Sequence, residues 1–413
     1  MGSPRIYQAT MIKRFLITAC SFAAVGGLLI SPSLRAAEGF AMTLEGETLK
    51  GEIRSIGKDG QVNIGDQKIE LEALRYIAPA QASGAEPEQE GKESSLRIIL
   101  ICGSDLRATD LAFEDEDFVF SSASAKRELT IPVDSVRAVR LSLPIEGSRF
   151  ESTLALEADQ RKEDTVYVNG VAGELLELNC LIEGITADSV SFDRNGKKET
   201  IARDKIHGVI LASPDLDAPM PTRAVMDDRS TFAGKVASLS DGKLAIEMID
   251  GIAVELPWEN VRRLRVYSSR LVSVAGLEPK EVKTQAILAP KWEFRRNLSV
   301  AGNELTIGKD VFDQGLGLAA GMQVTYDLEG DFDLFTATIG IDAETQRRGD
   351  CEFVLVGDGR ELFRQRVRGS DAAELVKVVV SGVRELTIAV EPGENLDISD
   401  HANWAEASLL QAK

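Results

Sequence analysis

The stretch Asp400–Leu410, "DHANWAEASLL", gathers side chains that could do chemistry, because it holds one of the two histidines of the chain (His401) and one of its three tryptophans (Trp404). Such a set could form a catalytic dyad, a metal site, a platform for a sugar ring, or a corner of the fold. A Ser-His-Asp site would have to use His401, but the sequence has no GxSxG elbow to go with it. These residues therefore do not predict an enzyme.

The same stretch also has the pattern of a β-strand. Ala405, Ala407 and Leu409 alternate with Glu406 and Ser408, which predicts a strand that is entered through "DHAN". We expect Asp400 and His401 to fix this corner through hydrogen bonds to each other or to nearby backbone. On this interpretation, replacing His401 with Ala lowers stability more than ligand affinity.

The remaining metal-binding and nucleophilic residues are dispersed. His207 and His401 are 194 positions apart, and Cys102, Cys180 and Cys351 form no CxxC pair, so zinc is not expected. All three cysteines lie in apolar, strand-like runs, which predicts buried free thiols. His207 lies between apolar residues in a repeated segment and is predicted to be a rim residue.

The composition limits the environment and the partners. Near its start, the segment 11–37 has two adjacent basic residues, Lys13 and Arg14, and then an apolar run and a Pro/Ser break before paired alanines, the pattern of a bacterial secretory signal. We therefore expect a secreted, periplasmic or envelope protein with no membrane span after cleavage. Cys20 follows a sequence that resembles a lipoprotein cleavage box. Without residues 1–37, which hold four basic and no acidic residues, the net charge falls from −19 to −23, and nucleic-acid binding is not expected.

Short alternating runs separated by Gly, Asn and Asp predict a mostly β chain. A closing segment recurs four times with one apolar spacing. Its members are Ile69, Leu74, Ile77; Ile131, Val136, Val139; Ile201, Ile206, Val209; and Leu256, Val261, Leu264. Each repeat is predicted to be a meander of about five strands with a one-turn element before the last strand, similar to small SH3-like or Sm-like barrels.

The predicted organisation has nine segments. They are an N-terminal extension and signal peptide (1–37), β-repeat 1 (38–80), a disordered acidic linker (81–95), β-repeat 2 (96–145), a helical linker (146–163), β-repeat 3 (164–212), a Pro-rich linker (213–221), β-repeat 4 (222–270) and a β-sandwich with its lead-in (271–413).

The last segment resembles a known family. It contains "FDQGLGL" (312–318), "VTYDLEGDFDLFTATIGID" (324–342), "FVLVGDGRELF" (353–363), "VSGVRELTIAV" (380–390) and "DHANWAEASLL" (400–410). These motifs are similar to those of the NPCBM domain, a carbohydrate-binding module with a galactose-binding-like jelly-roll fold. Family members usually have a histidine where this chain has Ala319, so any role of that histidine is lost here.

The resemblance implies a glycan site on loops at one end of the sandwich. Such a site needs an aromatic face and planar polar groups. The residues that meet this need are Trp292, Asp342, Glu344, Arg347, Asn395, Asn403 and Trp404. Both tryptophans are more often core or rim residues than sugar platforms, because a large ring is usually well buried, and Asp358 is predicted to be a hairpin turn residue. The resembled fold often carries structural calcium, for which Asp397 and Asp400 offer ligands.

Two functions follow from this sequence. The first is an exported, non-catalytic carbohydrate-binding protein, in which the β-repeats serve as a spacer or docking array. The second is an envelope scaffold whose repeats bind protein partners and whose NPCBM-like domain no longer binds sugar. An accessory subunit of a glycoside hydrolase is a third interpretation.

Overall fold

The computed structural model describes residues 38–79, 96–145, 148–154, 161–170, 174–212, 220–285, 292–394 and 396–411. Over these ranges the regular secondary structure is almost entirely β-strand, which confirms the predicted mostly β class with antiparallel sheets. No helix in the described ranges is long and apolar enough to cross a membrane. The predicted signal peptide, Cys20 and the acidic linker lie outside them.

The part of the chain before residue 270 consists of meanders whose last strand returns to pair with the first. Repeat 1 contains β1 (Glu38–Thr43), β2 (Thr48–Ile56), β3 (Gln61–Ile64), β4 (Gln67–Glu70), the 3-10 turn η1 (Leu71–Ala73) and β5 (Leu74–Pro79). Repeat 2 contains β6 (Arg97–Leu100), β7 (Asp105–Arg107), β8 (Thr109–Glu114), β9 (Asp117–Ser122), β10 (Arg127–Pro132), η2 (Val133–Ser135) and β11 (Val136–Arg140). In both, first and last strands pair antiparallel.

Repeats 3 and 4 have the same plan. The short helix α1 (Arg149–Leu154) precedes repeat 3, which contains β12 (Asp164–Asn169), β13 (Leu175–Ile185), β14 (Ser189–Arg194), β15 (Lys197–Ala202), η4 (Arg203–Lys205) and β16 (Ile206–Ile210). Repeat 4 contains β17 (Thr222–Met226), β18 (Thr231–Ser240), β19 (Lys243–Glu247), η5 (Ile249–Gly251), β20 (Ala253–Pro257), η6 (Trp258–Asn260) and β21 (Val261–Val266). Strands β12 and β16, and β17 and β21, again pair. The SH3-like or Sm-like type stays a prediction.

A β-bulge explains the repeated apolar spacing. The second and third apolar positions are three residues apart, so in a regular strand they would face opposite sides. In each closing strand the residue after the second position is skipped in the pairing with the first strand. The bulge restores the phase, and both apolar residues are buried in all four repeats. The skipped residues are Arg75, Arg137, His207 and Arg262.

His207 is therefore the bulge residue of repeat 3, and its prediction as a rim residue is wrong. Its side chain is fully buried, its Nδ1 lies 2.6 Å from the hydroxyl of Ser142, and Phe150 packs edge-on against the ring at 5.0 Å. Burial lowers the pKa of His207. The buried site therefore favours the neutral ring.

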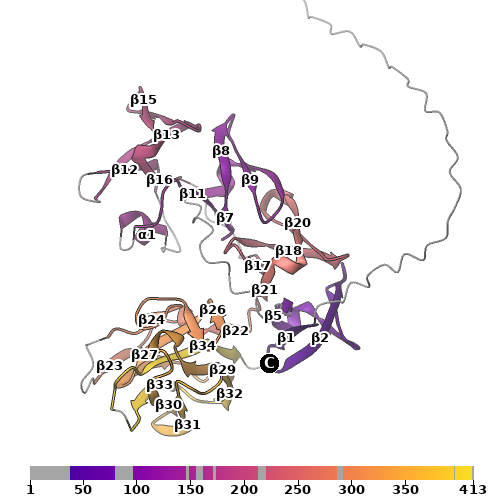
Figure 1. The fold of residues 1–413 in the computed structure, drawn as a ribbon, viewed down its shortest axis with the longest axis vertical. Helices are drawn as coiled ribbons and strands as arrows, with labels where there is room; N and C mark the ends of the chain where they lie inside the picture. Colours follow the sequence, from indigo (N-terminus) through magenta and orange to yellow (C-terminus); the bar gives the residue numbers. More distant parts are fainter. Residues whose placement is uncertain are drawn as a thin grey trace, which may run out of the picture. The chain divides into compact units, whose positions relative to one another are not determined.

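The repeats are joined in pairs by their closing strands. Strand β5 pairs antiparallel with β21, with Ile77 opposite Leu264, and β11 pairs with β16, with Val139 opposite Val209. Figure 1 shows β5 beside β21. In both pairs the third apolar position of one repeat faces the same position of the other. The repeated closing segment thus forms the junction between repeats as well as their cores.

The C-terminal unit is a two-sheet sandwich. Its strands are β22 (Leu271–Ser273), β23 (Glu281–Thr284), β24 (Arg295–Arg296), β25 (Leu305–Ile307), β26 (Asp310–Phe312), β27 (Gly315–Ala319), β28 (Met322–Asp327), β29 (Phe332–Ile341), β30 (Asp350–Gly357), β31 (Arg360–Arg368), β32 (Glu374–Val379), β33 (Glu385–Pro392) and β34 (His401–Gln411), with 3-10 turns η7 (Val274–Gly276) and η8 (Ala343–Thr345). One sheet has the order β24-β27-β34-β29-β32 and the other β23-β28-β33-β30-β31. The predicted sandwich is confirmed.

Strand β34 also contacts repeat 4, through a bulge that the predicted alternation did not include. Glu406 has a positive φ of 53° and is buried. Its carboxylate accepts hydrogen bonds from Arg263 Nη1 at 2.6 Å and from both Nη atoms of Arg265, at 3.0 and 2.6 Å. Asp313 accepts from Arg265 Nε at 2.6 Å. Burial alone would raise the pKa of Asp313, but the charges of Arg265 and Arg263 outweigh burial and lower it.

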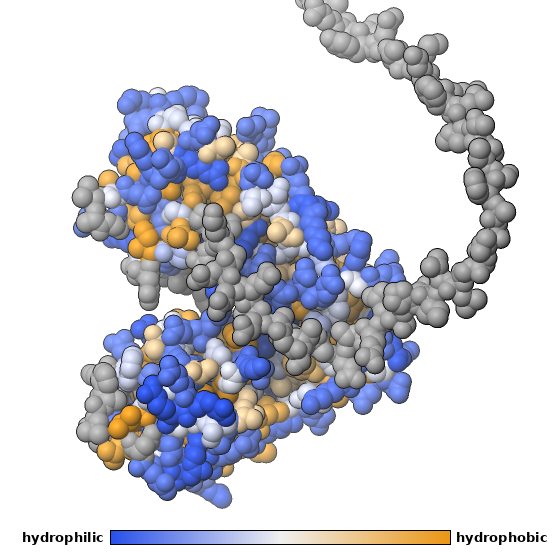
Figure 2. Space-filling model, in the orientation of Figure 1, coloured by the Kyte–Doolittle hydropathy of each residue, from blue (hydrophilic) through white to orange (hydrophobic). Residues whose placement is uncertain are grey.

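On the face that Figure 2 draws, polar residues cover most of the described surface, as the high net negative charge predicts, and apolar residues lie in patches between them. The three cysteines of the described residues are buried and free, which confirms the prediction from their apolar surroundings.

Candidate functional site

Three of the predicted side chains meet at one end of the sandwich. His401 opens β34, and its Nδ1 lies 2.5 Å from Glu344 Oε1 in η8. The half-buried ring of Trp292 packs edge-on against His401, with 5.1 Å between ring centroids. The side chains of His401 and Glu344 are 18% and 16% exposed, so both are held by the protein yet still reach the surface. We call Trp292, Glu344 and His401 the aromatic–acid cluster.

The carboxylate of Glu344 is fixed in position by neighbouring donors. Its Oε2 accepts hydrogen bonds from Ser299 Oγ at 2.9 Å and from Asn303 Nδ2 at 2.8 Å. Burial alone would raise the pKa of Glu344, but the hydrogen bonds from Asn303, His401 and Ser299 outweigh it and lower the pKa. Because Glu344 is ionised, the Nδ1 of His401 must donate to it. In a neutral ring, Nε2 of His401 is then an acceptor.

Glycine brings the loop with Ser299 close to the sheet. A Cβ on Gly317 in β27 would lie 2.4 Å from the carbonyl oxygen of Leu298 and 2.6 Å from the amide nitrogen of Val300. Any larger residue at this position would therefore push the loop away. The "GLGL" motif thus positions Ser299 against Glu344.

A second layer of polar residues supports the cluster from below. Asp342 is buried, and its carboxylate accepts from the amide of Glu344 at 2.9 Å, the amide of Thr306 at 3.0 Å and Asn403 Nδ2 at 2.5 Å. Burial raises the pKa of Asp342, although these hydrogen bonds oppose the shift. Asp342 and Asn403 were predicted to contact glycan, but at 2% and 0% exposure they position the turn that carries Glu344.

One other predicted glycan contact needs correction. Trp404 is fully buried and packs against Phe335 and Phe353, with ring centroids 5.9 and 5.1 Å apart, so its face cannot stack on a sugar. Arg347 is exposed and donates to the carbonyl of Ser370, and its contact with glycan stays a prediction. Asn395 lies outside the described residues.

The predicted corner residues have different roles. The Oδ1 of Asp400 accepts from the amide of Asp350 at 2.7 Å, which ties β34 to β30 as expected of a corner. The predicted hydrogen bond of His401 was to Asp400 or to nearby backbone. Its Nδ1 instead contacts Glu344, so His401 belongs to the aromatic–acid cluster. Ala319, the departure from the family pattern, pairs directly with His401 across β27 and β34.

Calcium near Asp397 and Asp400 stays a prediction. Within the described ranges, no group of three or more His, Cys, Asp or Glu side chains is placed to hold a metal ion. Both aspartates are buried.

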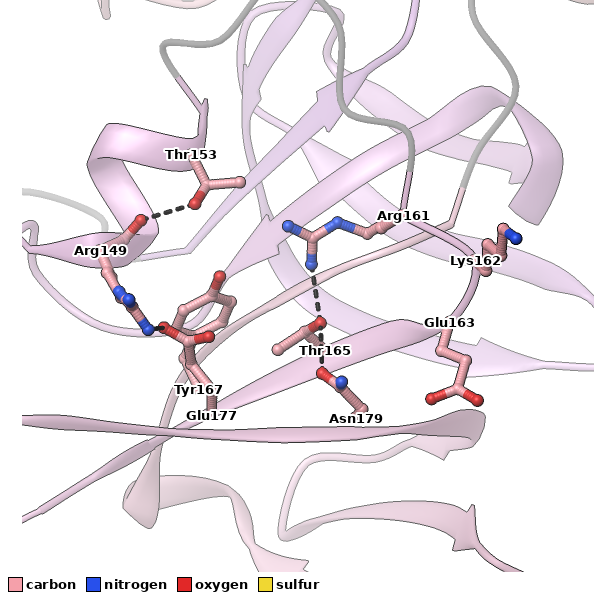
Figure 3. Close-up of a pocket in the computed structure, with 9 residues that line it drawn as sticks. All are labelled: Arg149, Thr153, Arg161, Lys162, Glu163, Thr165, Tyr167, Glu177 and Asn179. Carbon is pink, nitrogen blue, oxygen red and sulfur yellow. Dashed lines mark hydrogen bonds and ion pairs between the residues drawn. The ribbon is translucent and has the colours of Figure 1, made fainter.

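A separate pocket of about 500 Å³ lies on repeat 3, between α1 and strands β12 and β13 (Figure 3). Arg161 Nη1 donates to Thr165 Oγ1 at 2.8 Å, and this hydroxyl lies 3.3 Å from Asn179 Oδ1. Arg149 pairs with Glu177 at 3.0 Å. Figure 3 shows both arginines on the same side of these strands, with Tyr167 between them. The residues that line this pocket are mostly charged or polar.

Comparison with known proteins finds similarity in the C-terminal sandwich. Residues 272–410 match the model of the NPCBM/NEW2 domain, which confirms the resemblance predicted for this part of the chain. A protein of Renibacterium salmoninarum named "Putative endo-alpha-N-acetylgalactosaminidase" is 30% identical over 112 residues, or 26% of this chain. The chain spans only 7% of the length of that relative. The C-terminal unit is thus an NPCBM domain, and the match supports carbohydrate binding by it.

Solved structures of CBM51 modules are also similar to this chain. The module of Clostridium perfringens GH95 in complex with methyl-galactose is 27% identical and covers 34% of this chain and 99% of its own, with a TM-score of 0.31. CBM51-2 of Clostridium perfringens ZmpB, in complex with GlcNAc and with INT domains, is 20% identical, covers 42% and 39%, and has a TM-score of 0.32. The tandem CBM51 modules of the family 98 glycoside hydrolase of Streptococcus pneumoniae are 12% identical and cover 87% and 88%, at 0.31.

Proposed function

We propose that this protein is an exported, non-catalytic carbohydrate-binding protein whose NPCBM domain binds glycan at the aromatic–acid cluster. The observation that carries this proposal is the contact of His401 with both Glu344 and Trp292. A sugar ring presents an apolar face and a rim of hydroxyl groups. Trp292 offers a partly exposed aromatic surface for the face, and Glu344 and His401 offer acceptors for two hydroxyl groups.

The cluster is organised before any ligand binds. Glu344 accepts three side-chain hydrogen bonds, and Asp342 holds the turn beneath it. Binding therefore requires little ordering of these side chains, which reduces the entropic cost of association. The role of the four repeats in this proposal is to dock the NPCBM domain to other envelope or secreted components.

A glycan array tests the proposal. The full chain should bind at least one glycan class, with or without calcium, and Glu344→Gln should lose that binding while keeping its near-UV circular dichroism. Glu374→Gln, an exposed acid of β32, is the matched control and should bind as the wild type does. A folded wild-type chain that binds no glycan in either condition would refute the proposal.

One observation favours a second function, that of an envelope scaffold. Ala319 faces His401 where the family usually has histidine, so one polar group is lost beside the cluster. The charged pocket on repeat 3 (Figure 3) offers a surface for a protein partner. If the array is negative, a pull-down with the full chain and with Arg161→Ala tests this function, and equal capture by both would count against the pocket.

A further inference from the structure

The turn between β17 and β18 of repeat 4 is held in a fixed conformation. Arg229 lies in this turn with a positive φ of 66°, and its carbonyl accepts a hydrogen bond from Arg97 Nη2 at 3.0 Å. The neighbouring Asp228 accepts from Ser124 Oγ at 2.6 Å. Both donors belong to repeat 2, so two repeats fix the position from which the Arg229 side chain extends.

The side chain of Arg229 reaches the NPCBM domain. Its Nη2 pairs with Glu304 Oε2 at 3.3 Å, in the loop that also carries Asn303. The side chains of Arg229 and Glu304 are 55% and 48% exposed, so this pair lies at a surface that a ligand can reach. Exposed pairs of this kind contribute little to stability. Stability therefore does not explain why the Arg229–Glu304 pair lies beside the proposed glycan site.

Arg229 and the NPCBM domain together line a cavity of about 450 Å³. The domain contributes Asn303, Glu304, Thr306, Asp342, Ala343 and Glu344. This volume lies within the range of about 300–1,000 Å³ typical of small-ligand sites. Glu344 lines the cavity and also contacts His401, so the cavity shares this residue with the aromatic–acid cluster.

The lining indicates which chemistry the cavity accepts. Arg229, Glu304 and Asn303 offer a guanidinium, a carboxylate and an amide, the planar groups that bind sugar hydroxyls. The carboxylates of Glu304 and Glu344 line the cavity with one guanidinium, and this balance disfavours a ligand that carries a negative charge. Resting on the proposed function, we infer that the cavity is a second subsite for an uncharged sugar unit, linked to the sugar bound at the cluster, and that Arg229 determines the preference for the longer glycan. Repeat 4 is then part of the binding site.

Isothermal titration calorimetry on the full chain tests this inference. The probes are two pairs: methyl-galactoside with N-acetyllactosamine, and N-acetylglucosamine with di-N-acetylchitobiose. We expect the wild type to bind at least one disaccharide about tenfold more tightly than its matching monosaccharide. Arg229→Ala should reduce this ratio to below about twofold by weakening disaccharide binding. Glu304→Gln, which leaves Arg229 in place without its ion pair, should give an intermediate ratio.

The control is Arg54→Ala, which removes an arginine from another exposed Arg–Glu pair, with Glu52 in β2, and should leave the ratio unchanged. A wild type that binds the monosaccharide but gains nothing from the disaccharide would overturn the second subsite and leave the proposed function standing. So would an Arg229→Ala variant, folded by circular dichroism, that keeps the full ratio. A wild type that binds none of the probes or any arrayed glycan refutes both.

Discussion

Glu406→Gln tests the buried charge cluster between β34 and repeat 4. The wild-type carboxylate accepts three hydrogen bonds from Arg263 and Arg265, and the side chains of Glu406 and Arg265 are only 8% and 6% exposed. Removing one partner of a buried ion pair costs about 3–5 kcal/mol, because the other charge stays desolvated. Asp313 still neutralises Arg265. We therefore expect Glu406→Gln to lower the free energy of unfolding by about 3 kcal/mol, the lower end of this range.

Urea unfolding followed by tryptophan fluorescence measures this loss. Trp258 lies in repeat 4, and Trp292 and Trp404 lie in the NPCBM domain, so the signal reports both sides of the contact. Glu255→Gln breaks an exposed pair with Lys243 and should leave the unfolding midpoint unchanged. A Glu406→Gln chain that unfolds within about 0.5 kcal/mol of the wild type would refute the reasoning.

Three further predictions concern single residues. Burial lowers the pKa of His207, so the folded state favours the neutral ring. The free energy of unfolding should therefore fall as the pH drops below about 6.5, the pKa of histidine in the unfolded chain. In His207→Gln, the urea midpoint should depend less on pH between pH 7 and pH 5. Trp404→Ala should lower the free energy of unfolding in urea by about 3–5 kcal/mol, because the ring fills the core. Trp292→Ala should lower it less and should abolish glycan binding on the array. A Trp292→Ala variant that binds glycan, with binding lost in a folded Trp404→Ala variant, would contradict the site. Ala319→His should tighten glycan binding in calorimetry about fivefold, which corresponds to one added hydrogen bond of about 1 kcal/mol beside His401. Unchanged affinity in a folded variant would contradict a role for this position.

The sequence predicted the fold well where local pattern decides it. Alternating apolar residues between Gly and Asp turns predicted the strands, and the closing segments were found by their spacing. The bulges were not predicted, because a skipped residue such as Arg75 looks like any other strand residue until the partner strand is known. Glu406 was expected to alternate outward regularly, but a bulge places it against Arg265.

The binding cluster was predicted only in part. Trp292 and Glu344 were named because aromatic and acidic side chains in loops fit glycan binding. Residue type alone favoured a packing role for Trp404, because large rings are usually buried, but it could not separate Trp404 from Trp292, which is only half-buried. Ser299, Asn303 and Arg229 were missed because they reach the site only through tertiary contacts. The glycines of "GLGL" were a usable signal for the close loop.

The most direct test of glycan binding at the aromatic–acid cluster is a crystal structure of the full chain with an array-positive glycan. The account predicts a sugar ring against Trp292, with hydroxyl groups about 2.6–3.0 Å from Glu344 and about 2.7–3.2 Å from His401 Nε2. A glycan bound elsewhere, such as in the pocket on repeat 3, with the cluster left unchanged, would contradict it.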